Sequence, residues 1–153
     1  MAQPTIGIVG SESLLGKEIR EVLRSRSVEA NVQLIGSDEE ETGKITEEGD
    51  EPAVITALDR TNLLTADLIV MAGSEAGTRK AWEILSAEEG PFVIDATGVL
   101  EDQPAAKLAA PLVDGGVNLT PPCVMANPAA AALAFLLKRL PAYRTAIANV
   151  FEP

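Results

Sequence analysis

The chain has 153 residues, no histidine, one cysteine and a formal net charge of −11 at neutral pH. This length is sufficient for one domain with its own core, and the excess of carboxylates argues against nucleic acid and anionic membrane surfaces as partners. The absence of histidine from the sequence excludes Ser–His and Cys–His catalytic pairs and histidine-ligated zinc. A general base would therefore be a carboxylate, a lysine or a tyrosine.

The sequence contains neither a signal-peptide pattern nor a run of about 18 apolar residues that could cross a bilayer. The longest apolar run, residues 129–137, is too short. One cysteine allows no intramolecular disulfide. We therefore expect a cytoplasmic protein without a metal site or a membrane segment.

The N-terminal residues predict a strand, a tight turn and a helix. An apolar run at residues 5–9 ends at Gly10, and apolar residues then recur at helical spacing. The residues expected to face the core are Leu15, Ile19, Val22 and Leu23, and those expected on the charged, opposite side are Lys17, Glu18, Arg20, Glu21 and Arg24.

Glycines at positions 7, 10 and 16 approximate the dinucleotide-binding fingerprint, in which a strand enters a helix through a glycine-rich turn. Ser13 stands where a further turn glycine is expected. The free N–H groups and positive dipole at the start of such a helix suit a phosphate. The alternative interpretation is that the glycines only let the strand and the helix pack closely.

Residues 31–35 alternate in period two and predict a second strand, which leads into the acidic stretch 37–51. One interpretation is a solvated loop with a short edge strand near residues 44–46. The other is functional, because the end of the second strand faces the adenosine ribose in dinucleotide-binding domains. Asp38 would then favour a free 2′-hydroxyl, and Glu39–Glu41 would repel a 2′-phosphate.

Further along, the pattern predicts a third strand at residues 53–58, a connection at 62–66, and a fourth strand at 67–73, which ends in glycine. Ser74 is the expected N-cap of a helix that runs to about Ser86, with Ala81, Trp82 and Leu85 facing inward. A fifth strand is expected at residues 92–95.

Residues 101–113 are less regular, 115–122 read as loop, and a short strand is expected at 123–126. Asn127 as N-cap with Pro128 at the first helical position predicts a helix start. The helix, residues 129–140, is apolar nearly all round and is expected to be buried. Residues 145–150 predict one more strand.

These elements predict an α/β fold: a Rossmann-like three-layer domain over residues 1–153, with a mostly parallel sheet and helices on both faces. Ligands of such sheets bind at the carboxyl ends of the strands. The predicted cofactor-binding residues, which follow the strand ends, are Gly10, Ser11, Glu12, Ser13, Leu14, Leu15, Ser37, Asp38, Ala72, Gly73, Thr97 and Gly98.

In motif order and spacing, nearly the whole chain resembles the N-terminal nucleotide-binding domain of aspartate-semialdehyde dehydrogenase. The segments that carry the resemblance are Gly7–Gly10 with Leu15-Gly16, Ser37 with Gly43-Lys44, residues 67–73, Val93-Ile94-Asp95, Val117-Asn118 and Ala126-Asn127-Pro128. The resemblance implies a homo-oligomeric enzyme that reduces an acyl phosphate through a cysteine thioester, usually with NADPH. It also implies a C-terminal dimerisation and substrate domain, which this chain would lack.

The departures from the family pattern concern its chemistry. The family motif Asn-Pro-x-Cys reads Asn127-Pro128-Ala129-Ala130, so Ala130 stands at the nucleophile position and no thioester can form. The family's general-base histidine is absent, and the arginine that binds substrate phosphate aligns with Leu100. Acidic residues replace the basic residue that accompanies Ser37.

We therefore predict no catalytic residue in this chain. Cys123 is expected in a buried strand, where a thiol is inert, and Lys44 and Tyr143 are interpreted as surface or packing residues. Three functions stay open. The first is an NAD-binding domain that keeps the adenine dinucleotide, NAD rather than NADP, without catalysis. The second is a non-catalytic oligomerisation or interaction module without a cofactor, and the third is an oxidoreductase whose nucleophile lies on a C-terminal domain.

Overall fold

The computed structural model describes residues 3–49, 51–115, 121–140, 142, 144–147 and 149. Within these residues a six-stranded sheet has the order β2-β1-β5-β6-β8-β7, and every neighbouring pair is parallel. The strands of this sheet are β1 (Thr5–Val9), β2 (Asn31–Ile35), β5 (Leu68–Met71), β6 (Phe92–Asp95), β7 (Lys107–Ala109) and β8 (Cys123–Met125). The predicted parallel α/β sheet is confirmed.

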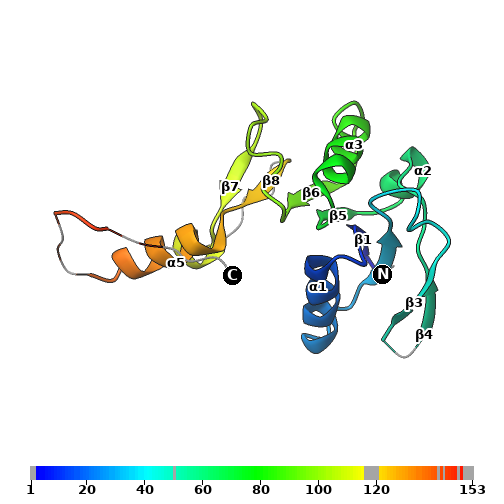
Figure 1. Cartoon of the computed structure of the whole chain (residues 1–153), viewed down its shortest axis with the longest axis horizontal. Helices are drawn as coiled ribbons and strands as arrows, with labels where there is room; N and C mark the ends of the chain where they lie inside the picture. Colours follow the sequence, from blue (N-terminus) through cyan, green and yellow to red (C-terminus); the bar gives the residue numbers. More distant parts are fainter. Residues whose placement is uncertain are drawn as a thin grey trace.

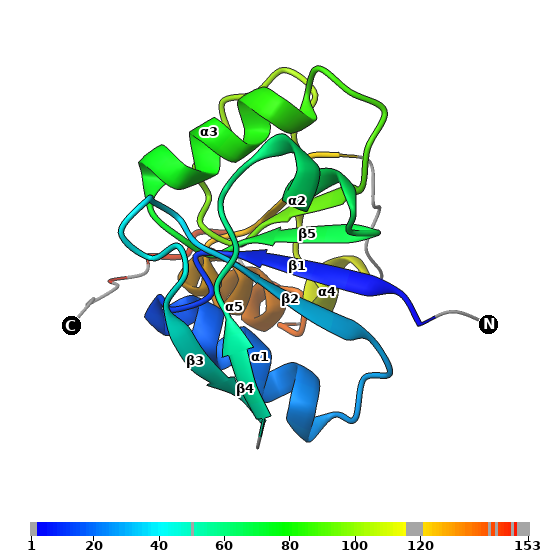
Figure 2. The same cartoon turned by 90° about the vertical axis from the view of Figure 1, so that its right-hand side faces the viewer.

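Helices cover both faces of the sheet, as predicted (Figure 2). Helix α1 (Leu14–Ser25) packs Ile19 and Leu23 against one face. Helices α2 (Arg60–Leu64) and α3 (Glu75–Leu85) lie on the other face, where Ala81 and Leu85 join the larger core cluster. Ser74 caps α3, as expected, by accepting a hydrogen bond from the Gly77 N–H.

Helix α1 is turned relative to the prediction. Leu15 and Val22 are 37% and 54% exposed, whereas Arg20, expected on the charged side, is only 9% exposed. The cause is Gly16, which packs directly on the turn before the helix. A Cβ atom there would lie 2.3 Å from the Gly10 carbonyl oxygen. The side of the helix that carries Gly16 and Arg20 therefore faces the rest of the protein.

The predicted third strand at residues 53–58 is wrong. Strand β4 (Glu51–Val54) instead pairs antiparallel with β3 (Ile45–Glu48) in a separate hairpin. Beyond it only Thr56 bridges to Ile35 of the main sheet, and Ile55 and Leu58 enter the core. Asp59 then caps α2, where a plain connection was expected. The apolar run is therefore divided between a hairpin, a bridge and a helix cap, and it forms no continuous ladder.

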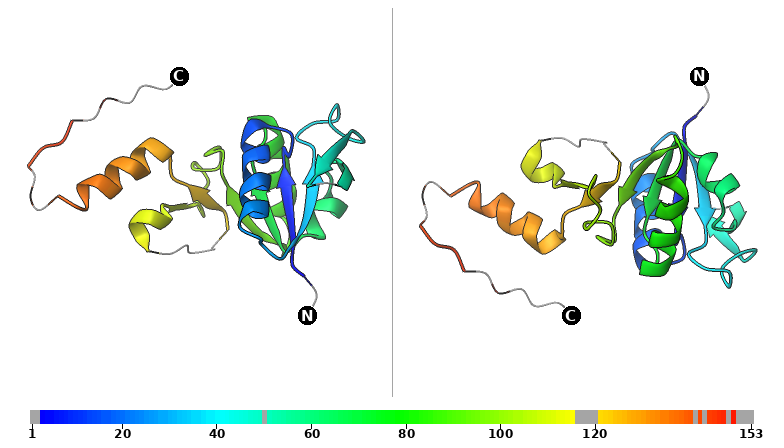
Figure 3. Two further views of the ribbon diagram at one scale, coloured as in Figure 1. Left: turned by 90° about the horizontal axis from the view of Figure 1, so that it is seen from below. Right: turned by 90° about the horizontal axis from the view of Figure 1, so that it is seen from above.

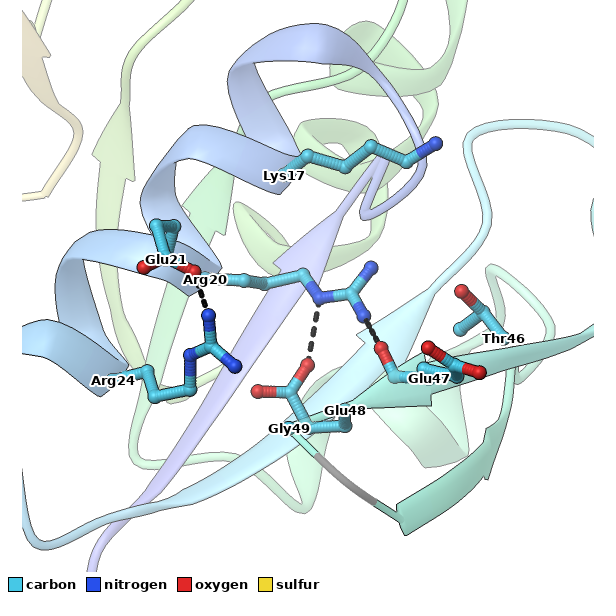
Figure 4. A pocket seen from close by; sticks show the side chains of 8 residues that line it. All are labelled: Lys17, Arg20, Glu21, Arg24, Thr46, Glu47, Glu48 and Gly49. Atoms are coloured by element: carbon cyan, nitrogen blue, oxygen red, sulfur yellow. Dashed lines mark hydrogen bonds and ion pairs between the residues drawn. The ribbon is translucent and has the colours of Figure 1, made fainter.

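Arg20 joins this hairpin to α1 (Figure 4). Its Nε donates to a Glu48 carboxylate oxygen at 2.6 Å, and its guanidinium also donates to the Glu47 carbonyl. On the other side, Nη1 donates to Glu12 at 2.8 Å and to the Ser11 carbonyl at 3.2 Å. One nearly buried cation thus ties β3 to the turn between β1 and α1.

The C-terminal part differs most from expectation. Residues predicted to be irregular form β7 and the short helix α4 (Pro111–Asp114). Helix α5 (Pro128–Leu137) begins at Asn127 as predicted, but none of its residues is buried. It projects from the sheet, with α4 beside it (Figures 1 and 3). Residues 145–147 and 149 form no strand, contrary to the prediction. Ala148, Val150, Val117, Asn118 and Tyr143 lie outside the described residues.

The ends of β1, β2 and β5 meet at glycines. Gly10 has a φ of +78°, and a Cβ atom on it would lie 2.1 Å from the Gly73 Cα. A Cβ atom on Gly73 would lie 2.7 Å from the Ser37 Cβ. The three strand ends therefore approach each other without intervening side chains, which forms a corner at the carboxyl edge of the sheet.

This corner predicts a large effect of Gly10→Ala. Left-handed backbone strain and the clash with Gly73 should together lower the free energy of unfolding by about 3 kcal/mol or more. The matched control is Gly98→Ala, because Gly98 has the same φ of +78° but a Cβ atom on it would meet no atom within 4 Å. It should lose only about 1 kcal/mol. Urea unfolding measures both, and equal losses would contradict the close contact.

Removing the Arg20 side chain should also be costly. Arg20→Met leaves Glu48 and two carbonyls without the Arg20 donor and removes one of the two cations beside Glu12, and we expect a loss of about 2–3 kcal/mol in unfolding free energy. Arg24→Met is the control, since Arg24 pairs with Glu21 at an exposed site and such pairs contribute under about 1 kcal/mol. A loss for Arg20→Met no larger than for the control would show that the ion cluster does not hold the hairpin.

Candidate functional site

The turn between β1 and α1 leaves backbone donors free. The N–H groups of Gly10 and Ser11 donate to the Ile35 carbonyl at 2.8 and 3.3 Å, which joins the turn to β2. The N–H groups of Leu14 and Leu15, in the first turn of α1, have no acceptor among the described residues. They point from the positive end of a 12-residue helix, so this turn can bind an anion.

Ser13 replaces the missing turn glycine with side-chain bonds. Its hydroxyl donates to the Ala72 carbonyl at 2.6 Å and accepts from the Gly16 N–H at 2.9 Å. The serine therefore caps α1 and fixes the turn to the end of β5. Nearby, the fully buried Ser11 hydroxyl has no partner in the described part of the chain, and an ordered water or a ligand oxygen would satisfy it.

Glu12 points toward the hairpin cluster. Burial raises its pKa, but hydrogen bonds from Thr46, Lys17 and Arg20, with the charge of Lys17, outweigh burial and hold the pKa below its usual value. Lys17 lies 3.3 Å and Arg20 2.8 Å from its oxygens. The carboxylate stays ionised but is neutralised by two cations, which weakens its repulsion of an anion at α1.

Two acidic residues organise the loop after β2. The N–H and hydroxyl of Ser37 both donate to Oε2 of Glu41, at 2.6 and 3.1 Å. Asp38, predicted to face a ribose, accepts from the Glu41 N–H at 3.0 Å and so closes the loop. In the sequence, Glu41 stands out only as part of an acidic run, although its four-residue spacing from Ser37 across a turn is the signal that pairs them.

Asp95 organises the loop after β6. It is fully buried, and its carboxylate accepts from the Thr97 N–H and hydroxyl and from the Leu100 N–H. These bonds turn Leu100 into the core, where it is 1% exposed. Leu100 therefore cannot contact a ligand, and the neighbouring Glu101 lines the adjacent cavity instead. Neither role follows from the pattern of the sequence.

That cavity has a volume of about 660 Å³ and joins four elements. Three of its sides are formed by Leu15 of α1, by Thr97 and Gly98 after β6, and by residues 109–112. The fourth side is formed by residues 125–128 and Ala131. Its surface is mostly apolar, and Glu101 is the charged residue that lines it. Of the predicted cofactor-binding residues, the cavity brings together Leu15, Thr97 and Gly98. Another group, Gly10, Ser37 and Gly73, meets at the glycine corner beside Ala72.

Ala130 precedes the cavity-lining Ala131 in sequence but does not itself line the cavity. It is exposed in the first turn of α5, while Pro128 and Ala131 line the cavity wall. The Asn127 side chain accepts from the Ala129 and Ala130 N–H groups at 2.9 and 3.4 Å. Cys123 is buried on β8, and burial raises the pKa of its thiol, which lowers the fraction of reactive thiolate.

In the described ranges, no group of three or more His, Cys, Asp or Glu side chains is placed to hold a metal ion. Nor does any described helix have the length and apolar character needed to cross a bilayer.

Comparison with known proteins gives a family and a fold. Residues 5–119 match the family model described as semialdehyde dehydrogenase, NAD binding domain. Comparison with curated proteins gives no match. Aspartate semialdehyde dehydrogenase II from Vibrio cholerae, solved in complex with ASA, is similar at a TM-score of 0.73 and 19% identity, over 90% of this chain and 46% of that chain.

A probable aspartate-semialdehyde dehydrogenase from Pseudomonas aeruginosa is similar at a TM-score of 0.71 and 19% identity, over 89% of this chain and 41% of that chain. The chain thus spans less than half the length of these solved structures, and the Rossmann-like fold is confirmed. Because the family model covers more than half of its residues, the chain belongs to the semialdehyde dehydrogenase family, whose NAD-binding domain it carries.

Proposed function

We propose that this chain binds NAD at the glycine corner and no longer supports thioester chemistry. The observation that carries the proposal is the pair of free N–H groups on Leu14 and Leu15, in a chain that carries an NAD-binding domain. Gly10, Ser11 and Ser13 would shape the turn around the pyrophosphate. When bound, the dinucleotide would supply hydride-transfer chemistry.

The loop after β2 supports NAD over NADP. Ser37 begins this loop, and the four residues that follow it are Asp38 and Glu39–Glu41. Lys44 is the only cation between residues 37 and 44. A 2′-phosphate beside these carboxylates would be repelled, whereas a ribose hydroxyl can donate to one of them.

The other end of the ligand would lie toward the cavity of Leu15, Thr97 and Gly98. Ala130, next in sequence to the cavity-lining Ala131, has no nucleophilic atom, and the one cysteine of the sequence is buried elsewhere. Glu101 would also repel a substrate phosphate there. These features support binding without acyl transfer, which makes the chain a pseudoenzyme within an oxidoreductase family.

Helix α5 supports a further part of the proposal. Its apolar residues are not buried, and Leu136 is 60% exposed. A surface of this kind is usually covered by another domain or subunit. We propose that a second domain, or another subunit of a homo-oligomer, covers α5, as expected when a chain spans less than half of its solved relatives.

The same observation favours a second candidate function, a non-catalytic interaction module. Leu108 and Leu112 are 67% and 76% exposed near α5, so the apolar surface extends beyond one helix. This function needs no nucleotide and is distinguished from the first by ligand binding.

Titration with NAD and NADP tests the proposal. We expect NAD to raise the free energy of unfolding by RT ln(1 + [L]/Kd), observed as a higher melting temperature. We expect NADP to bind more weakly. Calorimetry gives the two dissociation constants directly. No stabilisation by either nucleotide at millimolar concentration would favour the interaction module, and tighter binding of NADP would refute the proposed preference.

Restoring the sulfur should not restore the reaction. Ala130→Cys should give no phosphate-dependent reduction of NAD or NADP with an aldehyde substrate, because the sequence offers no histidine base and the charged residue that lines the cavity is the anionic Glu101. Ala131→Cys is the matched control, and a thiol reagent verifies that each new cysteine is accessible. Phosphate-dependent activity of Ala130→Cys alone would contradict the loss of catalysis.

A further inference from the structure

Ser37 presents two donors to one position. At the carboxyl end of β2, its N–H and its hydroxyl converge on the same oxygen of Glu41, at 2.6 and 3.1 Å. The serine lies against the glycine corner, since a Cβ atom on Gly73 would be 2.7 Å from the Ser37 Cβ. Two donors that converge beside a dinucleotide turn form an anion site, and a side chain of the protein fills it.

The loop is built to hold Glu41 in this position. Asp38 accepts from the Glu41 N–H at 3.0 Å, and the Gly43 N–H donates to the Ile55 carbonyl at 2.8 Å. Gly36 makes room for the side chain, because a Cβ atom there would lie 3.1 Å from the Glu41 Cβ. Glu39 and Glu40 are exposed, and their side chains make no hydrogen bond to Ser37.

The carboxylate of Glu41 has no cationic partner in the part of the chain that the structure describes. No lysine or arginine of the described residues forms an ion pair with it. Both Ser37 bonds use Oε2, and Oε1 accepts no hydrogen bond within the described part of the chain. A carboxylate in this state repels a second anion and keeps one oxygen available for a hydroxyl donor.

We propose that Glu41 is the residue that selects the dinucleotide, because its carboxylate occupies the two Ser37 donors that a 2′-phosphate would need. Its free Oε1 accepts the 2′-hydroxyl of the adenosine ribose. Asp38, which the sequence favours for that role, instead closes the loop that positions Glu41. This inference rests on the proposed function, NAD binding at the glycine corner.

The test compares Glu41→Gln with Glu40→Gln. Both variants remove one negative charge from the same loop, but only the first removes the carboxylate that Ser37 contacts. Calorimetric titration with NAD and NADP gives the ratio of dissociation constants for each protein. We expect Glu41→Gln to strengthen NADP binding and to reduce the NAD preference at least about tenfold, and Glu40→Gln to change it less than about threefold.

The outcomes separate the two hypotheses. If the unchanged protein does not bind NAD, the proposed function fails and this inference fails with it. If it binds NAD but both variants change the ratio equally, or Glu41→Gln leaves NADP affinity unchanged, only the role of Glu41 is refuted. Should Glu41→Gln not fold, as judged by its melting curve, Glu41→Asp replaces it. The shorter side chain cannot span both Ser37 donors, and an NAD/NADP ratio like that of the unchanged protein would also refute the role.

Discussion

The contact between the backbones of Gly10 and Gly73 is the constraint on which the rest of the molecule depends. It brings the ends of β1 and β5 closer than any side chain would allow, and Ser37 at the end of β2 packs against the same point. Ser13 then reaches the Ala72 carbonyl and begins α1 at a fixed place. Because three strands end together, the free donors of α1 lie beside the loop that holds Glu41.

Regular patterns in the sequence were sufficient for most of the sheet. Hydrophobic periodicity predicts strands β1, β2, β5 and β6 and the inward residues of α3. Capping chemistry predicts the helix starts at Ser74 and Asn127. The rotation of α1 did not, because it depends on the contact of Gly16 with a distant turn. Likewise, the partition of residues 53–58 is decided by tertiary pairing, which outweighs local propensity.

Polar side chains in the site were harder to predict than the fold. Arg20 has the sequence character of a surface residue, yet four partners from two elements surround it. Glu101 and Leu100 are neighbours in sequence, and only the bonds of Asp95 decide which of them is buried. Helix α5 was misjudged for a related reason, because an apolar composition shows that a helix needs a partner but not whether this chain supplies it.

The bonds of Asp95 also have an energetic consequence. Because a buried carboxylate already fixes Thr97 and Leu100, the wall of the cavity has its shape before a molecule enters. Such preorganisation means that association immobilises little additional backbone, and the entropic cost of binding falls mainly on the incoming molecule.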